Sequence, residues 1–222
     1  MVGLLSVSGT VWAQSAPADT VLGAGMLPPT IPIFPLEDAM LFPNVSRPFH
    51  IFEPRYRAMV ADALKGDRVI GMVTLRPGYE ANYEGRPPIY PIGCAGVITD
   101  VEELPDGQFN IMLRGLVKFR VTGEDQSRSY RLARVDAMPE VPDAAERAAL
   151  QKQRQRLVVL VTEPGANPRV PPEIPDEEVV NALAQYLPLD PLERQTLLEL
   201  KGVLSRSQAL IDLLEVKAVP PR

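Results

Sequence analysis

The sequence predicts an α+β fold, in which a closed or nearly closed β domain comes first and a small helical subdomain follows. Three observations lead to this prediction. Between residues 31 and 139, apolar residues mostly follow the period of strands, with glycine and proline separating the stretches. After Pro139 the apolar period becomes helical. The 24 prolines favour short elements and stiff loops, because proline fixes φ and lacks an amide donor.

The β domain is expected to start with a strand at Ile31 that proline cuts short near the run Phe34-Pro35-Leu36. Further on, Pro105-Asp106-Gly107 predicts a hairpin turn, since glycine readily takes the positive φ that such a turn needs. Gly115 marks a bend after the hairpin. The remaining strands are predicted at Arg68 to Leu75, Gly96 to Leu104, Gln108 to Arg114, Val117 to Val121 and Tyr130 to Ala137.

One helix interrupts the predicted strands. Pro54 suits a first helical turn, where its missing N–H costs nothing, and Gly66 is typical of a helix end. Between them, apolar residues recur at helical spacing and should face the core. This stripe comprises Tyr56, Met59, Val60, Ala63 and Leu64.

Capping patterns predict the helices of the subdomain. Asp143 and Glu146 form a capping-box pattern that opens a long polar helix ending before Pro164. A proline-rich linker, Glu163 to Pro175, separates it from a second helix starting at Asp176, whose acidic residues 176–178 suit a first turn. The second helix should bury Val179, Val180, Leu183, Tyr186 and Leu187. Two more helices are expected, one from Asp190 with Glu193 as its capping-box partner and one from Ser205 with Gln208 in the same role.

The first residues resemble an export leader. Val2 to Trp12 is uncharged and mostly apolar or small, and Val11-Trp12-Ala13 is similar to a signal-peptidase site, although no Lys or Arg precedes Arg47. This pattern favours an exported, periplasmic protein over a cytoplasmic one. We therefore expect a signal-peptide-like or disordered leader over 1–25, the β domain over 26–139 and the helical subdomain over 140–222. No stretch reaches the ~20 apolar residues of a membrane span.

Residues suited to catalysis or metal binding are scarce. Cys94 and His50 are the only cysteine and histidine, which excludes thiolate clusters and two-histidine zinc motifs. Cys94 is expected to be a small buried residue, and His50 a packed, hydrogen-bonded one. A P-loop and a G-x-S-x-G nucleophile motif are both absent from the sequence, and the five lysines lie in contexts that predict solvent exposure. Glu124-Asp125 is expected in a solvated turn. The sequence thus predicts no catalytic residue, cofactor site or metal site.

Several segments in order resemble the N-terminal domain of Lon proteases. The first are residues 31–36 (IPIFPL), 41–43 (LFP) and 50–56 (HIFEPRY), followed by residues 92–98, 104–107 and 114–121. The resemblance extends from about Ile31 to Leu214. The signature residues carried by these segments are His50, Phe52, Glu53, Arg55, Tyr56, Asp106, Gly107, Arg114 and Gly115. We expect them to be mainly structural, with Glu53 capping the helix at Pro54 and pairing with Arg55 or Arg57.

The resemblance implies a PUA-like β pseudo-barrel followed by helices. It also implies that the protein is a stand-alone bacterial member of the family, which stops where the ATPase and peptidase modules of Lon would begin. It implies a non-catalytic protein that recognises unfolded or extended polypeptides, with a protease or chaperone as a further partner. An extended peptide could bind apolar surface or pair with an exposed strand edge.

Two alternatives stay open. PUA-like folds can bind RNA, but the net charge of −5 and the scattered Lys and Arg residues disfavour nucleic acid. A hydrolase with an unrecognised site is the other alternative, although one histidine and one cysteine leave little material for it.

Overall fold

The computed structural model describes residues 27–79, 85–162, 170–171 and 173–218. The expected leader over 1–25 lies outside the described residues, as does most of the proline-rich linker. No described helix has the length and apolar character needed to cross a membrane.

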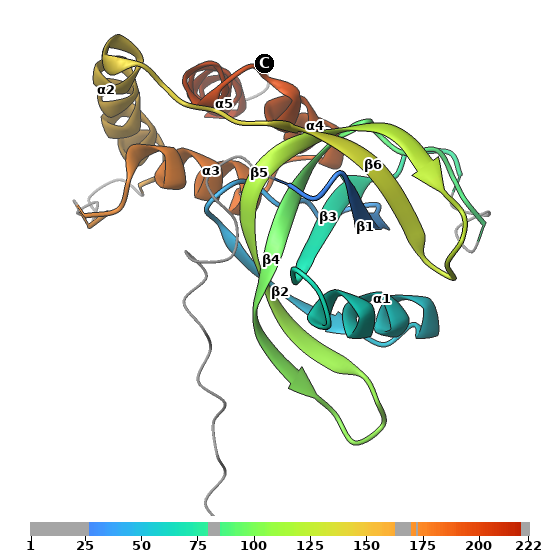
Figure 1. The fold of residues 1–222 in the computed structure, drawn as a ribbon. Coiled ribbons are helices and arrows are strands. Elements are labelled where there is room, and N and C mark those ends of the chain that lie inside the picture. Colours follow the sequence, from blue (N-terminus) through green and yellow to red (C-terminus); the bar gives the residue numbers. More distant parts are fainter. Residues whose placement is uncertain (1–26, 80–84, 163–169, 172, 219–222) are drawn as a thin grey trace, which may run out of the picture.

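The β region is one mixed sheet that closes on itself. The strand order is β2-β5-β4-β3-β1-β6, and β6 also pairs with β5. This second pairing makes a ring of β5, β4, β3, β1 and β6, with β2 lying alongside the first part of β5 (Figure 1). The predicted closed β structure is therefore confirmed. The strands are β1 (Thr30–Leu36), β2 (Ser46–Ile51), β3 (Val69–Thr74), β4 (Ile92–Glu103), β5 (Phe109–Asp125) and β6 (Arg131–Met138).

Two prolines lie inside β1 rather than ending it. The first part of the strand, Thr30 to Ile33, pairs with β6, and the second part, Ile33 to Leu36, pairs with β3. Pro32 therefore pairs only with β6 and Pro35 only with β3, so each has one edge where a missing N–H costs no ladder bond. The expectation that proline cuts the strand short is wrong.

The β4–β5 hairpin turns where the sequence predicts, and Gly107 has a φ of 76°. However, β5 does not end at Gly115. Gly96 pairs with Gly115 and Ala95 pairs with Val117, which leaves Leu116 as an extra residue. Such a β-bulge bends a strand without breaking it. The two strands predicted on either side of Gly115 are thus one long, curved strand (Figure 1).

The helices are α1 (Pro54–Leu64), α2 (Ala144–Val161), α3 (Asp176–Tyr186), α4 (Pro191–Glu199) and α5 (Val203–Ala218). The stripe predicted for α1 is buried at Tyr56, Met59, Val60 and Ala63. The capping box of α2 has both of its hydrogen bonds, at 2.8 and 2.9 Å. α5 begins two residues before the predicted Ser205, because Gly202, with a φ of 89°, already ends the preceding turn.

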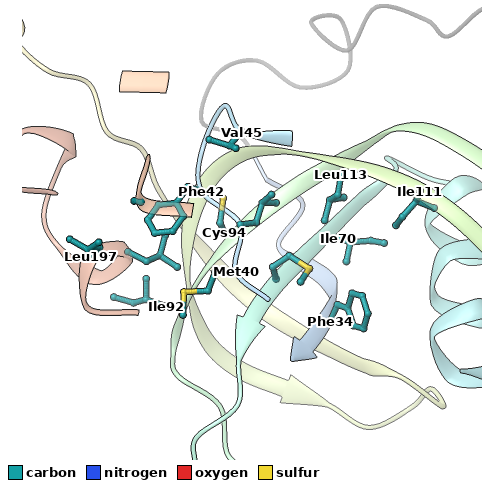
Figure 2. Packing of buried hydrophobic residues seen from close by; sticks show 14 of the residues in the cluster. Phe34, Met40, Phe42, Val45, Ile70, Ile92, Cys94, Ile111, Leu113 and Leu197 are labelled. Carbon is teal, nitrogen blue, oxygen red and sulfur yellow. The ribbon is translucent and has the colours of Figure 1, made fainter. Parts of the chain in front are cut away.

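The larger of two apolar clusters joins the ring to the helices, and the smaller one, around Phe119, lies within the sheet. Figure 2 shows Phe42, from the β1–β2 loop, beside Ile92 of β4 and Leu197 of α4. Where that loop meets α3, the buried residues are polar: Nδ2 of Asn181 donates to the Pro43 carbonyl at 3.0 Å, and Oε1 of Gln185 accepts from the Phe42 amide at 3.0 Å. The loop presents main-chain groups that need partners, so polar side chains fill the buried positions of α3.

Tyr186, which the helical pattern predicts to be buried, is 59% exposed. The apolar spacing of α3 therefore predicts the wrong residues to face the core at the C-terminal end of the helix. Asn181 and Gln185, both 2% exposed, lie inside.

Candidate functional site

Three strands present a solvent-exposed face that we call the outer face. Because Phe109, Ile111 and Leu113 of β5 point into the core, the alternating residues Asn110 and Met112 point outward. Pro48 and His50 lie beside them on β2, and Asp100 and Glu102 lie beside them on β4. Together these six residues border a shallow groove of about 440 Å³.

A chain of hydrogen bonds crosses the outer face. Nδ1 of His50 lies 2.9 Å from Oδ1 of Asn110, and Nδ2 of Asn110 donates to Oε2 of Glu102 at 2.9 Å. The carboxylate only accepts, which orients the amide and makes Nδ1 of His50 the donor. His50 is hydrogen-bonded as expected, but it is exposed, so the expectation of a packed histidine is wrong.

Phe52 adds apolar surface next to this chain. Its side chain is 59% exposed, and its ring lies 6.1 Å from the His50 ring at an angle of 25°. Ile51, between the two, is buried and holds the strand end in the core. An exposed aromatic ring on a well-anchored backbone is a common anchor for a binding partner.

The free edge of β2 offers few main-chain partners. The Ser46 carbonyl accepts hydrogen bonds from the Gln185 amide and the Tyr186 hydroxyl of α3. By strand alternation, Pro48 and His50 point their main-chain groups the same way, away from β5. Proline has no N–H to donate, which is a common means of blocking an edge strand. The edge of β2 therefore offers a ligand fewer main-chain groups than an unblocked edge strand would.

The signature residues Glu53, Arg55 and Tyr56 form the junction between β2 and α1. Glu53 and Arg55 form an ion pair at 2.9 Å, as expected, and the Arg55 guanidinium lies 4.7 Å from the Tyr56 ring centroid. Tyr56 is buried, with its ring 4.5 Å from that of Phe34. The Glu53 side chain does not cap the helix, so that part of the expectation is wrong.

The other signature residues lie in and after the hairpin. Asp106 accepts a hydrogen bond from the Gln108 amide within the exposed turn, and Gly107 lies under the Arg57 guanidinium. Gly115 is in close contact with the Phe42 carbonyl, and Arg114 is half-buried on β5. The structure thus places His50 and Phe52 beside the groove and Arg114 on the same side of β5, two residues beyond Met112, while the remaining signature residues lie elsewhere.

A second pocket, of about 270 Å³, is lined by Arg55, Tyr130 and Arg131 among others. Arg131 donates to both carboxylate oxygens of Glu124, at 2.9 and 2.8 Å, and to the Pro87 carbonyl at 2.8 Å. Glu124 lies in β5 and is part of this ion pair, so the expectation of a solvated turn at Glu124 is wrong.

Cys94 and Lys118 are both buried. Burial raises the pKa of the Cys94 thiol well above its usual range, which disfavours the reactive thiolate. Lys118 is 2% exposed, contrary to the prediction that all lysines are solvated. Its ammonium pairs with Glu140 at 2.6 Å and donates to the carbonyls of Leu198 and Leu200. None of these partners of Lys118 is a serine, as a Ser-Lys catalytic pair would need. The described residues hold no cluster of His, Cys, Asp or Glu suited to a metal ion.

Sequence reasoning missed Asn110, Asp100 and Glu102 as parts of a shared surface. Alternation in β4 and β5 was the available signal, since it places these residues on the solvent side. These residues lie next to His50 because β2 pairs with β5. No local sequence pattern indicates that pairing.

Comparisons with known proteins agree with this architecture. Residues 30–216 match the family described as the ATP-dependent protease La (LON) substrate-binding domain. The chain is 27% identical to Lon protease 2 of Myxococcus xanthus over 199 residues, covering 86% of this chain and 24% of that protein. It is 26% identical to Lon protease of Anaeromyxobacter dehalogenans, covering 92% and 26%. The chain thus spans about a quarter of the length of these relatives.

Solved structures show the same fold. The N-terminal domain of the Mycobacterium avium complex Lon protease has a TM-score of 0.63 and 17% identity, covering 84% of this chain and 98% of that one. The Lon N-terminal domain protein from Xanthomonas campestris has a TM-score of 0.58 and 21% identity, covering 86% and 99%. The chain therefore belongs to the Lon substrate-binding domain family.

Proposed function

We propose that this protein is a non-catalytic recognition module that binds unfolded or extended polypeptide segments on the outer face. One observation carries the proposal: Phe52 projects into solvent beside a groove of about 440 Å³ on three paired strands. Apolar side chains of an unfolded segment would bury against Phe52, Pro48 and Met112, and this burial supplies the main driving force.

The groups around the groove suit a polypeptide better than RNA. Its polar members are an amide, an imidazole and two carboxylates, which can bond main-chain and side-chain groups of a peptide. Phosphate binding relies on Lys and Arg, whereas the acidic side chains of Asp100 and Glu102 would repel a nucleic acid backbone. Burial of Cys94 and Lys118 supports a non-catalytic role. A protease or chaperone that receives the bound segment would be the natural partner.

The test is binding of a permanently unfolded protein, such as reduced and carboxymethylated lactalbumin, followed by fluorescence anisotropy without ATP. We expect saturable binding and an intact ligand on a gel. Phe52→Ala should weaken binding roughly tenfold, because it removes an anchor worth about 1–2 kcal/mol of buried apolar surface. Val141→Ala is the matched control, since Val141 is 83% exposed but lies in the segment between β6 and α2.

Absence of binding would contradict the proposal, as would cleavage of the ligand by the purified protein. Tight, salt-sensitive capture of RNA by the outer face would instead favour a nucleic-acid-binding role.

A further inference from the structure

The two margins of the groove differ in charge. The β4 margin carries the carboxylates of Asp100 and Glu102, whereas the β2 margin carries Pro48 and His50. Asn110 and Met112 form the floor between them. A ligand lying in the groove therefore meets negative charge on one side only.

The two carboxylates keep part of their bonding capacity. Oδ1 of Asp100 accepts from the Val101 amide, and Oε2 of Glu102 accepts from Asn110. Within the described part of the chain, the second oxygen of each carboxylate has no hydrogen bond and neither group has an ion-pair partner. Two arginines lie nearby: Arg57 is against Gly107, and Arg114, on the same side of β5 as Met112, is paired in register with Val97 rather than with Asp100. The negative charge of this margin is thus available to a ligand.

The position of these carboxylates limits where the ligand can lie. Adjacent strands are ~4.8 Å apart, so a strand added beside β2 would lie about 14 Å from β4. A lysine side chain cannot span that distance. A segment that contacts Asp100 and Glu102 must therefore cross the outer face itself, over Asn110 and Met112.

We propose that the outer face selects polypeptide segments in which a Lys or Arg accompanies apolar residues. This inference rests on the proposed polypeptide-binding function and specifies its substrate class. The alkyl part of the basic side chain lies on Met112 and Pro48, and its charged end reaches the free oxygens of Asp100 and Glu102. In an extended segment, residues two or four positions away from the basic residue lie on the same face of the segment. Apolar side chains at these positions would reach Phe52.

Two labelled peptides test the proposal: a flexible, apolar peptide containing one lysine, and the same peptide with norleucine in its place. Norleucine keeps the alkyl chain and removes the charge. In anisotropy titrations at low salt, the wild-type protein should bind the lysine peptide roughly three- to tenfold more tightly, as expected for two exposed ion pairs. The preference should shrink as salt is raised.

The variant D100N/E102Q should lose the preference while still binding both peptides. Glu103→Gln is the matched control, because Glu103 is exposed on the same strand but points to the opposite face. Thermal unfolding of each variant verifies folding. Equal affinity of the two peptides for the wild-type protein, or a preference that survives in D100N/E102Q, would overturn this inference but leave polypeptide binding intact. If neither peptide nor unfolded lactalbumin binds, the proposed function itself fails.

Discussion

Glu140 lies 2.6 Å from the ammonium nitrogen of Lys118, and the two side chains are only 13% and 2% exposed. Arg206 reaches the same carboxylate from α5 at 2.7 Å and also donates to the Leu197 carbonyl. Lys118 belongs to β5, so Glu140 joins the ring to the helices through two buried cations. This network makes the relative position of ring and helices depend on one carboxylate.

Replacing Glu140 should therefore be costly. In Glu140→Leu, Lys118 and Arg206 are left in a buried site without their counter-charge, and we expect the free energy of unfolding to fall by about 3–5 kcal/mol. Urea denaturation followed by circular dichroism measures this change. Adding Lys118→Met should recover part of the loss, since it removes one stranded cation. Glu103→Leu, on the exposed part of β4, should change stability by no more than about 0.5 kcal/mol.

Acid should weaken the protein through the same carboxylate. Burial raises the pKa of Glu140, but the charges of Arg206 and Lys118 outweigh it and hold the pKa below its usual range. A carboxyl group whose folded pKa is depressed contributes stability above its unfolded pKa, about 4.3, and loses that contribution as the pH falls through the folded pKa. The urea concentration at the unfolding midpoint, measured from pH 7 to pH 3, should fall once the pH is below about 4.3. This fall should be less steep in Glu140→Gln than in the wild-type protein. Parallel profiles for the two proteins would show that Glu140 is not responsible.

Gly115 should tolerate no side chain. A Cβ atom there would lie 2.0 Å from the Phe42 carbonyl oxygen, which is main chain and cannot move aside alone. We expect Gly115→Ala to lower the free energy of unfolding by about 1–3 kcal/mol, the usual cost of overpacking. At Gly66 the nearest atom to an added Cβ is 3.9 Å away, so Gly66→Ala should leave stability unchanged or slightly raised. Thermal melts of both variants decide this, and equal losses at the two sites would refute the packing argument.

Cys94 should be inert until the protein unfolds. The thiol is fully buried and its pKa is raised by that burial, so the folded protein offers a thiol-specific reagent neither access nor thiolate. Labelling with an aromatic disulfide should be absent in buffer and complete in concentrated urea. Rapid labelling under native conditions would mean that the core opens locally around β4.

Local patterns predicted many elements well because their causes are local. Proline at the first turn and a glycine near the end delimit α1, and Asp143 with Glu146 fixes the start of α2. The positive φ of Gly107 places the hairpin turn. In each case a short run of residues settles the backbone, whatever packs around it.

The errors come from contacts between distant segments. Lys118 alternates with apolar residues as a solvent-facing side chain would, but the C-terminal end of α4 and the segment around Glu140 cover that face of β5. Tyr186 has helical spacing suited to burial, yet the β1–β2 loop needs polar partners and places Gln185 inside instead. The outer face was missed for the same reason, since β2 and β5 are about sixty residues apart.

β5 continues through the bulge at Leu116 and so connects the groove to the helices. Residues before it pair with β2 under the groove, and Lys118, just after it, is bonded to α4. A pull on a segment held in the groove would therefore run along a single strand into the helices. The strand's hydrogen bonds with β4 would be loaded together, in shear, rather than opened one at a time. We expect the groove and the helices to yield to such a force as one unit.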